Sequence, residues 1–551
     1  MVLRWWIALL GGILMGITPA PVGAWPLAWI ALAPLWVQLI KAESKKENWT
    51  GLSSWQQDET LKKQAKSSNF NLKFLILNAL AWGIGYHGLA LSWVLGLHPL
   101  TWMGIPWVAS LAIALIALVL FTIWGATLVV TWAVPTKALF NLIPNPLIRI
   151  LIGTTIWCIL ESIWSAGPLW WTSLSYTQSP HNLAILHLGQ ISGPNTITAA
   201  IIAVNGLLAE AWINRPKPTA SPNSSSASSA SLRFVHKGYL ATSAALLIGL
   251  HLIGFSLYNQ PLNDQPNTAL KVGIIQGNVP NRIKFTREGF RRSLIGYTNG
   301  YITLAKQGVQ AVLTPEGALS SIWTDPPTTN DPLYQAILEK RIVAWIGAHR
   351  RRENSFTNSL FTVTGTGEIF SRYDKINLVP FGEYIPFEQL LGGFINSISA
   401  IGTSQIAGVS NQLFDTPFGR AIVGICFDSA FSRHFQRQAA AGGEFIITAS
   451  NNDPYSAAMQ LQHHAQDTMR AIETNRWAAR ATNTGYSGIV DPHGRTLWIS
   501  GHNTYEVRAE TIYRRQTQTL YVLWGDWLTL LLLGLVAVSV TWEIGNNKWQ
   551  K

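Results

Sequence analysis

Three residues in the second half of the chain carry the side chains that thiol-based acyl transfer needs. Glu316 in Thr-Pro-Glu-Gly, Lys375 after Tyr-Asp and Cys426 in Gly-Ile-Cys-Phe-Asp each follow an apolar or strand-like stretch. A thiol is a weak nucleophile near neutral pH unless a base or a cation favours the thiolate. A carboxylate can take the thiol proton, and an ammonium can stabilise both the thiolate and the oxyanion that follows. The combination therefore predicts an activated cysteine nucleophile.

Each of these residues alone is weak evidence. A single Cys at the end of a buried strand is more often inert packing, because free Cys is among the most buried residue types. A single Glu or Lys in a loop is usually a solvated charge. The other cysteine, Cys158, lies in a long apolar run, so the sequence indicates free thiols and no disulfide framework. The case for catalysis depends on all three residues, each at a strand end.

The elements around these residues alternate in type. Short β-branched stretches predict strands, and polar stretches between them predict helices. The predicted strands are 270–276, 311–314, 342–348, 359–364, 421–426, 445–449, 486–491 and 495–499, and the predicted helices are 287–307, 331–340 and 456–482. Alternating strands and helices predict an α/β domain with layered sheets.

The rest of the chain is far more apolar. Hydrophobic residues make up 48% of the sequence and charged residues 12%, about half the usual charged share of soluble domains. A membrane-spanning helix needs roughly 20 apolar residues. We expect about eight such helices, near 4–22, 26–40, 72–96, 103–133, 147–166, 192–213, 238–257 and 524–542. The first continues past Pro19 and Pro21 into the second, so it is expected to be a helix and not a signal peptide.

Basic residues in the connections predict the orientation. With a cytoplasmic N-terminus, the connections on the cytoplasmic side contain Arg4, Lys41, Lys45, Lys46, Lys62, Lys63, Lys66, Lys73, Lys137, Arg149, Arg215, Lys217, Arg233, Lys237, Lys548 and Lys551. The opposite connections, 20–27, 97–102 and 167–191, contain none. The positive-inside rule then places both termini and the loops 41–71 and 214–237 in the cytoplasm, and residues 260–520 outside. This asymmetry accounts for the net charge of +12 without nucleic acid.

The order Glu, Lys, Cys, with each residue on its own strand-end loop, resembles the nitrilase superfamily. The segment 375–387, KINLVPFGEYIPF, and the segment 276–280, QGNVP, are similar to one membrane branch of it, the apolipoprotein N-acyltransferases. The resemblance covers essentially the whole chain. It implies membrane helices in 1–258, a periplasmic nitrilase-like αββα sandwich in 259–521, and a last membrane helix with a short cytoplasmic tail in 522–551.

The resemblance also implies roles for individual residues. Cys426 matches the family nucleophile, Glu316 its general base and Lys375 its oxyanion-stabilising cation. Glu383, eight residues after Lys375, matches a second glutamate that positions the site. It implies no metal and no organic cofactor.

Further positions match the family's substrate-binding residues. Asn452 and Tyr455 resemble an asparagine and an aromatic residue beyond the next strand, where an inserted residue leaves the register open. Phe285 stands where the family commonly has Trp, and Phe427 and Asp428 where it often has Tyr and Glu. These substitutions keep aromatic and acidic character, so they affect substrate fit more than the reaction.

The implied reaction is acyl transfer at the outer face of the cell inner membrane. A membrane phospholipid would donate an acyl chain to Cys426, and the N-terminal amine of a diacylglyceryl-modified apolipoprotein would accept it. Two alternatives stay open. One is a membrane-anchored nitrilase-type amidase that hydrolyses a C–N bond. The other is a non-catalytic lipoprotein-binding factor, which would be expected to have lost one of the three residues.

The charged residues and histidines of the predicted helix 456–482 are expected to lie on its surface. Adjacent helical residues point about 100° apart, so His463 and His464 predict a surface helix face and not a metal pair. Arg470, Glu473 and Arg476 at three-residue spacing predict a surface ion-pair ladder.

Near the loop 167–191, the aromatic residues Trp164, Trp170 and Trp171 predict anchors at the membrane surface, and the alternative is that they line a lipid entry path. Glu161 is either functional at membrane depth or placed at that surface.

Overall fold

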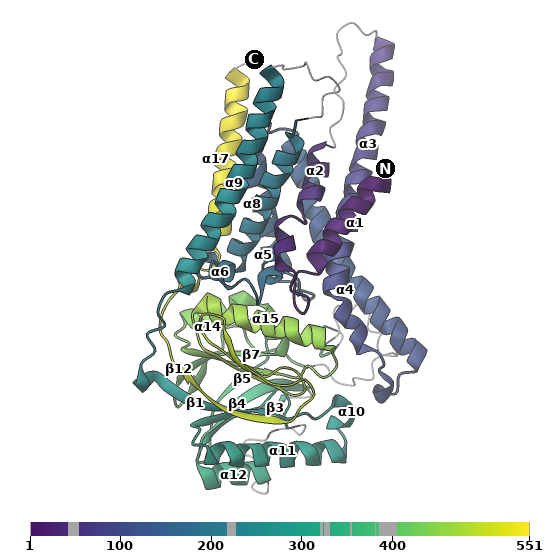
Figure 1. The fold of residues 1–551 in the computed structure, drawn as a ribbon. Coiled ribbons are helices and arrows are strands. Elements are labelled where there is room, and N and C mark those ends of the chain that lie inside the picture. Colours follow the sequence, from purple (N-terminus) through teal and green to yellow (C-terminus); the bar gives the residue numbers. More distant parts are fainter. Residues whose placement is uncertain are drawn as a thin grey trace.

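The computed structural model consists of a helical part and an α/β part (Figure 1). It describes residues 2–41, 54–216, 227–319, 323, 331–352, 355–380, 382–384 and 405–549. The expected cytoplasmic loops 41–71 and 214–237 and the segment 375–387 lie partly outside these residues. Side chains of 54–71 and 227–232 are also outside the description.

The helical part contains a helix in each of the eight predicted segments. These helices are α1 (Val2–Gly16), η1 (Trp25–Trp29) with α2 (Ala33–Lys41), α3 (Ser54–Ala90), α4 (Trp107–Phe140), α5 (Pro146–Trp164), α8 (Pro194–Ile213), α9 (Ala227–Tyr258) and α17 (Trp527–Trp549). Within the described residues, α4, α5, α8, α9 and α17 are long and apolar enough to cross a membrane. The first helix ends at Gly16, before Pro19 and Pro21, which cannot continue it, and the second segment is divided between η1 and α2.

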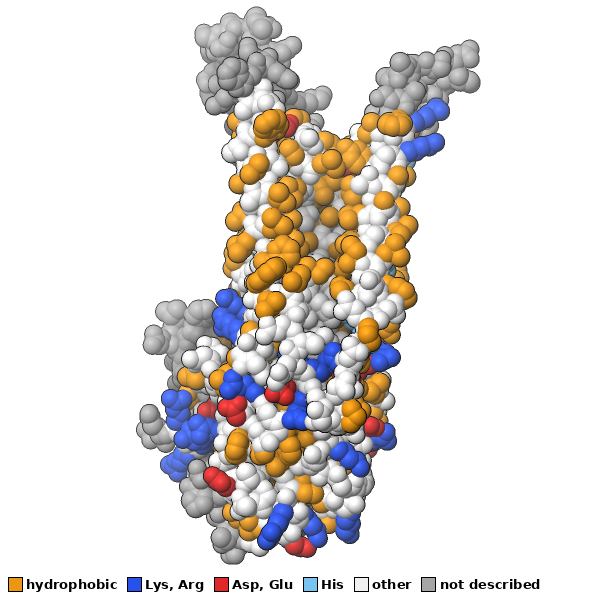
Figure 2. Space-filling model, turned by 90° about the vertical axis from the view of Figure 1, so that its left-hand side faces the viewer, with side chains coloured by type: hydrophobic (Ala, Val, Ile, Leu, Met, Phe, Trp, Pro, Cys, Tyr) orange, Lys and Arg blue, Asp and Glu red, His pale blue; other side chains and the backbone are white. Residues whose placement is uncertain are grey.

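The surface of the helical part is apolar around the bundle. Figure 2 shows hydrophobic side chains spread over the helices, while charged side chains lie mainly on the α/β part and at the far ends of the helices. Ile116 on α4, Leu252 on α9 and Val538 on α17 are among the exposed apolar residues. Such a surface is stable in contact with lipid and not with water. The chain is therefore a multi-pass membrane protein.

Tryptophans also fill the centre of the bundle. Trp36, Trp82, Trp132 and Trp157 are fully buried, and the Trp132 and Trp157 rings lie 5.1 Å apart between centroids. The 26 tryptophans of the chain are thus explained by helix packing as well as by the membrane surface.

The α/β part contains two six-stranded sheets within the described residues, in the orders β12-β1-β2-β3-β4-β5 and β11-β10-β9-β8-β7-β6. The strands are β1 (Ala269–Gln276), β2 (Ala311–Leu313), β3 (Val343–Arg352), β4 (Ser355–Val363), β5 (Ile369–Asp374), β6 (Phe414–Thr416), β7 (Gly419–Ile425), β8 (Phe445–Ser450), β9 (Ala478–Thr482), β10 (Gly488–Val490), β11 (Thr496–Ile499) and β12 (Glu506–Tyr513). Apolar residues from both sheets, including Leu313, Trp345 and Val423, form the core between them.

Helices cover the outer face of each sheet. One sheet packs against α11 (Arg287–Lys306) and α12 (Pro332–Lys340), and the other against α14 (Ser432–Ala440) and α15 (Ala457–Thr474). The layers confirm the predicted αββα sandwich. The α14 and α15 layer faces the membrane helices, and both marked chain ends lie toward the far end of the bundle (Figure 1).

The predicted helix 456–482 is wrong in its last part. The helix α15 ends at Thr474, Asn475 takes a left-handed φ of 54°, and Ala478–Thr482 form β9. Alanines favour helices locally, but β9 pairs in parallel with β8 and antiparallel with β10, so tertiary contacts override that preference.

The predicted surface face of α15 is also wrong. His463, His464, Arg470, Glu473 and Arg476 are all buried, because α15 lies between its sheet and the membrane helices. Arg470 donates to Glu473 across 2.9 Å within this layer. Arg476 is no part of a ladder and donates to backbone oxygens.

A loop after α5 joins the two parts. Trp171 Nε1 donates to Gln462 Oε1 of α15 at 2.7 Å, and Tyr176 Oη donates to the Ala430 carbonyl at 2.8 Å. Trp170 and Trp171 are buried, so their predicted role as surface anchors is wrong. Trp164, which is partly exposed, packs on Trp124.

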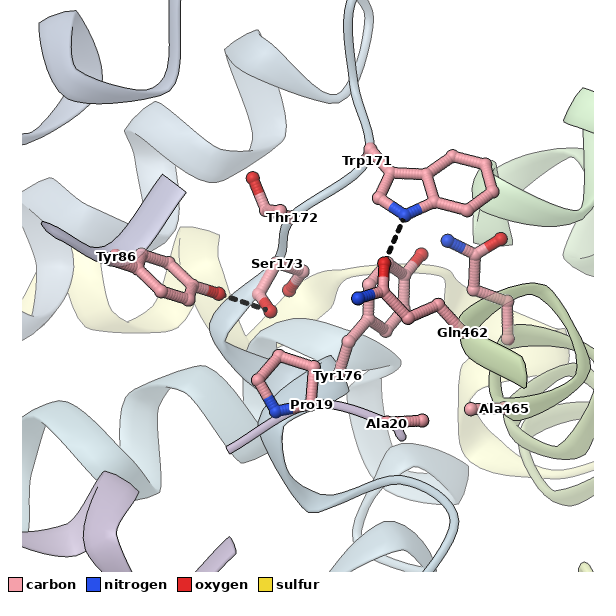
Figure 3. A pocket seen from close by; sticks show the side chains of 10 residues that line it. Pro19, Ala20, Tyr86, Trp171, Thr172, Ser173, Tyr176, Gln462 and Ala465 are labelled. Carbon is pink, nitrogen blue, oxygen red and sulfur yellow. Dashed lines mark hydrogen bonds between the residues drawn. The ribbon is translucent and has the colours of Figure 1, made fainter. Parts of the chain in front are cut away.

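Figure 3 shows a pocket at this junction, with Trp171 and Gln462 pointing toward one another. Its free volume of about 10 Å³ has room for about one water molecule, which is too little space for an acyl chain.

Glu161 fixes the same loop from the membrane side. Its Oε1 accepts from Trp157 Nε1 and Leu174 N, and its Oε2 accepts from the hydroxyls of Ser173 and Thr198. The residue is buried in the protein interior. The carboxylate therefore ties α5, the loop and α8 together.

Candidate active site

The three chemistry-bearing residues meet at one end of the sandwich. Glu316 follows β2, Lys375 follows β5, and Cys426 follows β7 as the first residue of the short helix η6 (Cys426–Ala430). Lys375 Nζ lies 2.9 Å from Glu316 Oε1 and 2.8 Å from Glu383 Oε1. Burial and, after it, the charge of the Glu316 carboxylate raise the pKa of the Cys426 thiol, so the two groups interact electrostatically.

Glu316 is held as a carboxylate. Its Oε1 also accepts from Asn358 Nδ2 at 2.6 Å, and its Oε2 accepts from the Asn451 backbone N–H at 2.7 Å. Burial acts to raise the pKa of Glu316, but the charge of Lys375 and the hydrogen bonds from Lys375 and the Asn451 backbone outweigh it, so the pKa is lowered. The group is therefore ionised and able to accept a proton at neutral pH.

Lys375 is held as an ammonium between two carboxylates. Burial acts to lower its pKa, but Glu316 and Glu383 outweigh burial and raise it well above its usual range. Glu383 is fixed in turn, since its Oε2 accepts from Val379 N at 2.7 Å. Burial raises the pKa of Glu383. The cation is thus charged, rigidly placed and largely shielded from water.

Cys426 sits in a strained turn at the end of its strand. Its φ is +52°, a left-handed conformation that is uncommon for residues other than glycine and that recurs at functional sites. Burial, followed by the Glu316 charge, raises the pKa of its thiol well above the usual range. The thiol is therefore protonated at rest, and it becomes a nucleophile when a base takes its proton.

Asp428 holds this turn in shape. Its carboxylate accepts from Ile425 N at 3.0 Å and from Asn377 N at 2.8 Å. The first bond closes the turn around Cys426, and the second ties it to the loop after Lys375. Asp428 thus stabilises the backbone around Cys426.

The other predicted substrate-binding residues differ in position. Asn452 Oδ1 lies 4.0 Å from Cys426 Sγ, and Tyr455 interacts electrostatically with the same thiol. Phe427 stacks on Trp171 of the helical part with centroids 6.1 Å apart. Phe285 is 68% exposed after the short helix α10 (Asn281–Lys284).

Sequence reasoning missed several residues of this site. Asn358 bonds Glu316 from β4, which also contains several Ser and Thr residues, and it lies just before the predicted strand 359–364, so nothing in the sequence singled it out. Asn451 acts through its backbone, which no side-chain pattern reveals. Lys284 is buried, and its Nζ lies 3.3 Å from the Glu316 carbonyl oxygen.

Both parts of the chain match known protein families. Residues 271–520 match the carbon-nitrogen hydrolase family model, and residues 61–207 match the apolipoprotein N-acyltransferase N-terminal domain. An apolipoprotein N-acyltransferase from Nostoc sp. is 56% identical over 97% of this chain and 99% of its own length. One from Synechocystis sp. is 42% identical over 96% and 99%.

Among solved structures, an amidase of the nitrilase superfamily from Nesterenkonia AN1 aligns with a TM-score of 0.36 and 14% identity. The alignment covers 47% of this chain and 95% of the amidase. The identity to full-length relatives decides the assignment: the chain belongs to the apolipoprotein N-acyltransferases, membrane acyltransferases of the nitrilase superfamily.

Proposed function

We propose that the protein moves an acyl chain from a membrane phospholipid, through a thioester on Cys426, to the N-terminal amine of a diacylglyceryl-cysteine lipoprotein. The single observation that carries this proposal is the buried ammonium of Lys375, which two carboxylates hold beside the thiol. Thiol, base and oxyanion cation together are the groups that acyl transfer needs.

In the first step Glu316 takes the thiol proton while Cys426 Sγ attacks the ester carbonyl of the phospholipid. The tetrahedral oxyanion forms beside the Lys375 ammonium. The C–O bond to the glycerol oxygen then breaks, and Glu316 returns the proton to that oxygen. A lysophospholipid leaves and a thioester remains on Cys426.

In the second step the lipoprotein amine attacks the thioester carbonyl, again with its oxyanion beside Lys375. Glu316 accepts a proton from the attacking nitrogen. The C–S bond breaks, the amide forms, and the sulfur leaves as a thiolate that regains its proton. Both steps use the same groups, so one site serves both substrates in turn.

The contact between the nucleophile's turn and the membrane part supports lipid substrates. Phe427, next to Cys426, stacks on Trp171, and the η6 carbonyl of Ala430 accepts from Tyr176. An acyl chain leaves the bilayer only at about 0.8 kcal/mol per CH₂, so a site built against membrane helices suits it. An amidase acting on small molecules has no such need.

We also place the sandwich on the periplasmic side of the inner membrane and both termini in the cytoplasm. Described basic residues support this, because Lys41 ends α2, Arg149 lies in the first turn of α5 and Arg215 follows α8. Basic residues in such connections favour the cytoplasm.

The adduct on Cys426 is the test of this chemistry. The purified enzyme is incubated with phospholipid alone, and its intact mass is measured. We expect a gain of one acyl group that neutral hydroxylamine removes, and no gain in Cys426→Ala. The matched control is Cys158→Ala, which should acylate normally. An adduct that persists in Cys426→Ala would refute the assignment of the nucleophile.

A further inference from the structure

His463 of α15 contacts both the backbone of Cys426 and the side chain of Asn452. Its Nε2 lies 2.8 Å from the backbone carbonyl oxygen of Cys426, and its Nδ1 lies 3.2 Å from Asn452 Oδ1. The same Oδ1 atom lies 4.0 Å from Cys426 Sγ. Both His463 and Asn452 are fully buried. A substitution of either residue should therefore affect the surroundings of Cys426.

The hydrogen-bond roles of these groups conflict in this arrangement. A backbone carbonyl only accepts, so Nε2 of His463 must carry a proton to bond Cys426. Burial lowers the pKa of His463 to about 3, so the ring is neutral and its Nδ1 carries a lone pair. That lone pair would then face the Asn452 oxygen, which is also an acceptor. At the same time Asn452 Nδ2 is buried without a partner among the described residues.

Turning the Asn452 amide over removes the conflict. The oxygen and nitrogen of an amide have nearly the same shape, so their partners decide which is which. With the nitrogen beside His463, one N–H can donate to Nδ1 and the second can point at Cys426 Sγ. The amide oxygen takes the position that has no partner, and an unpaired acceptor is tolerated better than an unpaired N–H.

We propose that His463 is a positioning residue that turns the Asn452 amide so that its N–H donates to the Cys426 thiolate. This rests on the proposed role of Cys426 as the nucleophile. The thiolate then has two stabilising neighbours, the ammonium of Lys375 and the amide of Asn452. Trp171 of the helical part packs edge-on against His463 with centroids 5.9 Å apart, which keeps the ring in place.

Charged groups on several elements act on His463 and on the Cys426 thiol. Asp467 and Arg480, which form a buried ion pair, act on His463 from α15 and β9, and Glu316 acts on it as well. Glu316, Lys375, Glu383 and Tyr455 act on the Cys426 thiol.

Lys284 lies next to Glu316, and burial lowers its pKa to about 8. Because it titrates in the range of the experiment, every variant compared below retains it. A difference between two pH profiles then reports on the thiol.

Two substitutions of His463 separate its two contacts. The Asn side chain can place an acceptor near the position of Nδ1, and the Gln side chain can place a donor near that of Nε2. If His463 acts through Asn452, His463→Asn keeps the thiolate reactive and His463→Gln does not. If His463 merely supports the Cys426 carbonyl, the order is reversed.

The measurement is the rate at which iodoacetamide alkylates Cys426, followed by peptide mass spectrometry from pH 6 to 9 in the full-length enzyme. Loss of a hydrogen bond to a charged group should slow alkylation roughly 10–100-fold at a fixed pH in Asn452→Ala and His463→Gln. His463→Asn should stay near the parent rate. The controls are His464→Asn and His464→Gln, since His464 is equally buried and bonds Thr496 instead.

Parent-like alkylation in Asn452→Ala, or the reversed order of the two His463 variants, would overturn the proposed role of His463. So would an equal slowing in the His464 variants, because it would show an effect of folding alone. The proposed function fails in a different way, through acyl transfer that survives Cys426→Ala.

Discussion

Lys375 Nζ lies 2.9 Å from Glu316 Oε1, and both side chains are at most 8% exposed. A buried charge without its partner is costly, and the attraction within a buried pair is little screened by salt. The pair therefore does two things at once. It keeps Glu316 ionised, as the proposed base must be, and it holds a cation where the proposed mechanism would form an oxyanion.

Replacing the cation should damage both activity and stability. Lys375→Met leaves Glu316 and Glu383 near one another without a counter-ion, so we expect acyl-enzyme formation to be lost. We also expect a loss of about 3–5 kcal/mol of stability, the usual effect of breaking a buried ion pair. Thermal unfolding and intact mass check these two effects. Lys340→Met, at an exposed pair with Glu339, should change neither, and equal effects at both positions would contradict the account.

Removing the base should slow the first step while the site stays folded. Glu316→Gln keeps the size of the side chain and an oxygen that accepts from Asn358 or Lys375, but it no longer takes a proton. A general base contributes roughly 10²–10⁴-fold, so single-turnover acylation should slow by at least that range. Lys375 keeps Glu383 as its counter-ion in this variant, so a cooperative thermal unfolding transition, which shows that the protein is still folded, is the control. Near-normal acylation would rule out Glu316 as the base.

Lys284 should make stability depend on pH. Burial lowers its pKa from 10.5 to about 8, so the folded protein releases this proton before the unfolded chain does. Between pH 8 and 10.5 the unfolded chain binds more protons, and stability therefore rises with pH by up to about 3 kcal/mol. In Lys284→Met this rise should be missing, and stability below pH 8 should increase. Thermal midpoints at pH 7 and 10 test this, and an equal rise in the variant would refute it.

The sidedness can be tested with fused reporters. A reporter near residue 60 or 225 should behave as cytoplasmic, because basic residues crowd these connections. A reporter inserted in an exposed turn of the sandwich, such as the one after Gly308, should behave as external. A cytoplasmic signal from the sandwich would reverse the proposed orientation.

The strand ends were the part of the site that sequence patterns could predict. Apolar strands that stop at Glu316 and Cys426 indicate where buried backbone gives way to reactive side chains. Asn358 could not be found in this way, because its amide points into the site from the middle of a strand. The Asn451 contribution is a backbone N–H, and its aim depends on how the loop folds.

Burial of α15 was the main error, and its cause is general. The helix carries His463, Arg470 and Glu473 on faces that would be exposed to water if the α/β part stood alone. The loop from Ser173 to Ser179 and the membrane helices cover those faces, and the polar groups are stabilised by pairing. The pattern along one helix indicates its polarity, but not which distant segment covers it.

The central claim is that the acyl group waits on Cys426 for an amine. The most direct measurement follows lysophospholipid release from phospholipid alone, and then adds a diacylglyceryl peptide. We predict a burst of one equivalent per enzyme that then stops. Release should restart as the acyl chain moves to the peptide amine, the pattern of covalent two-step catalysis. A peptide with a blocked amine should not restart it. Steady release of free fatty acid without any peptide would contradict the claim, because water would then be the acceptor and the enzyme a hydrolase.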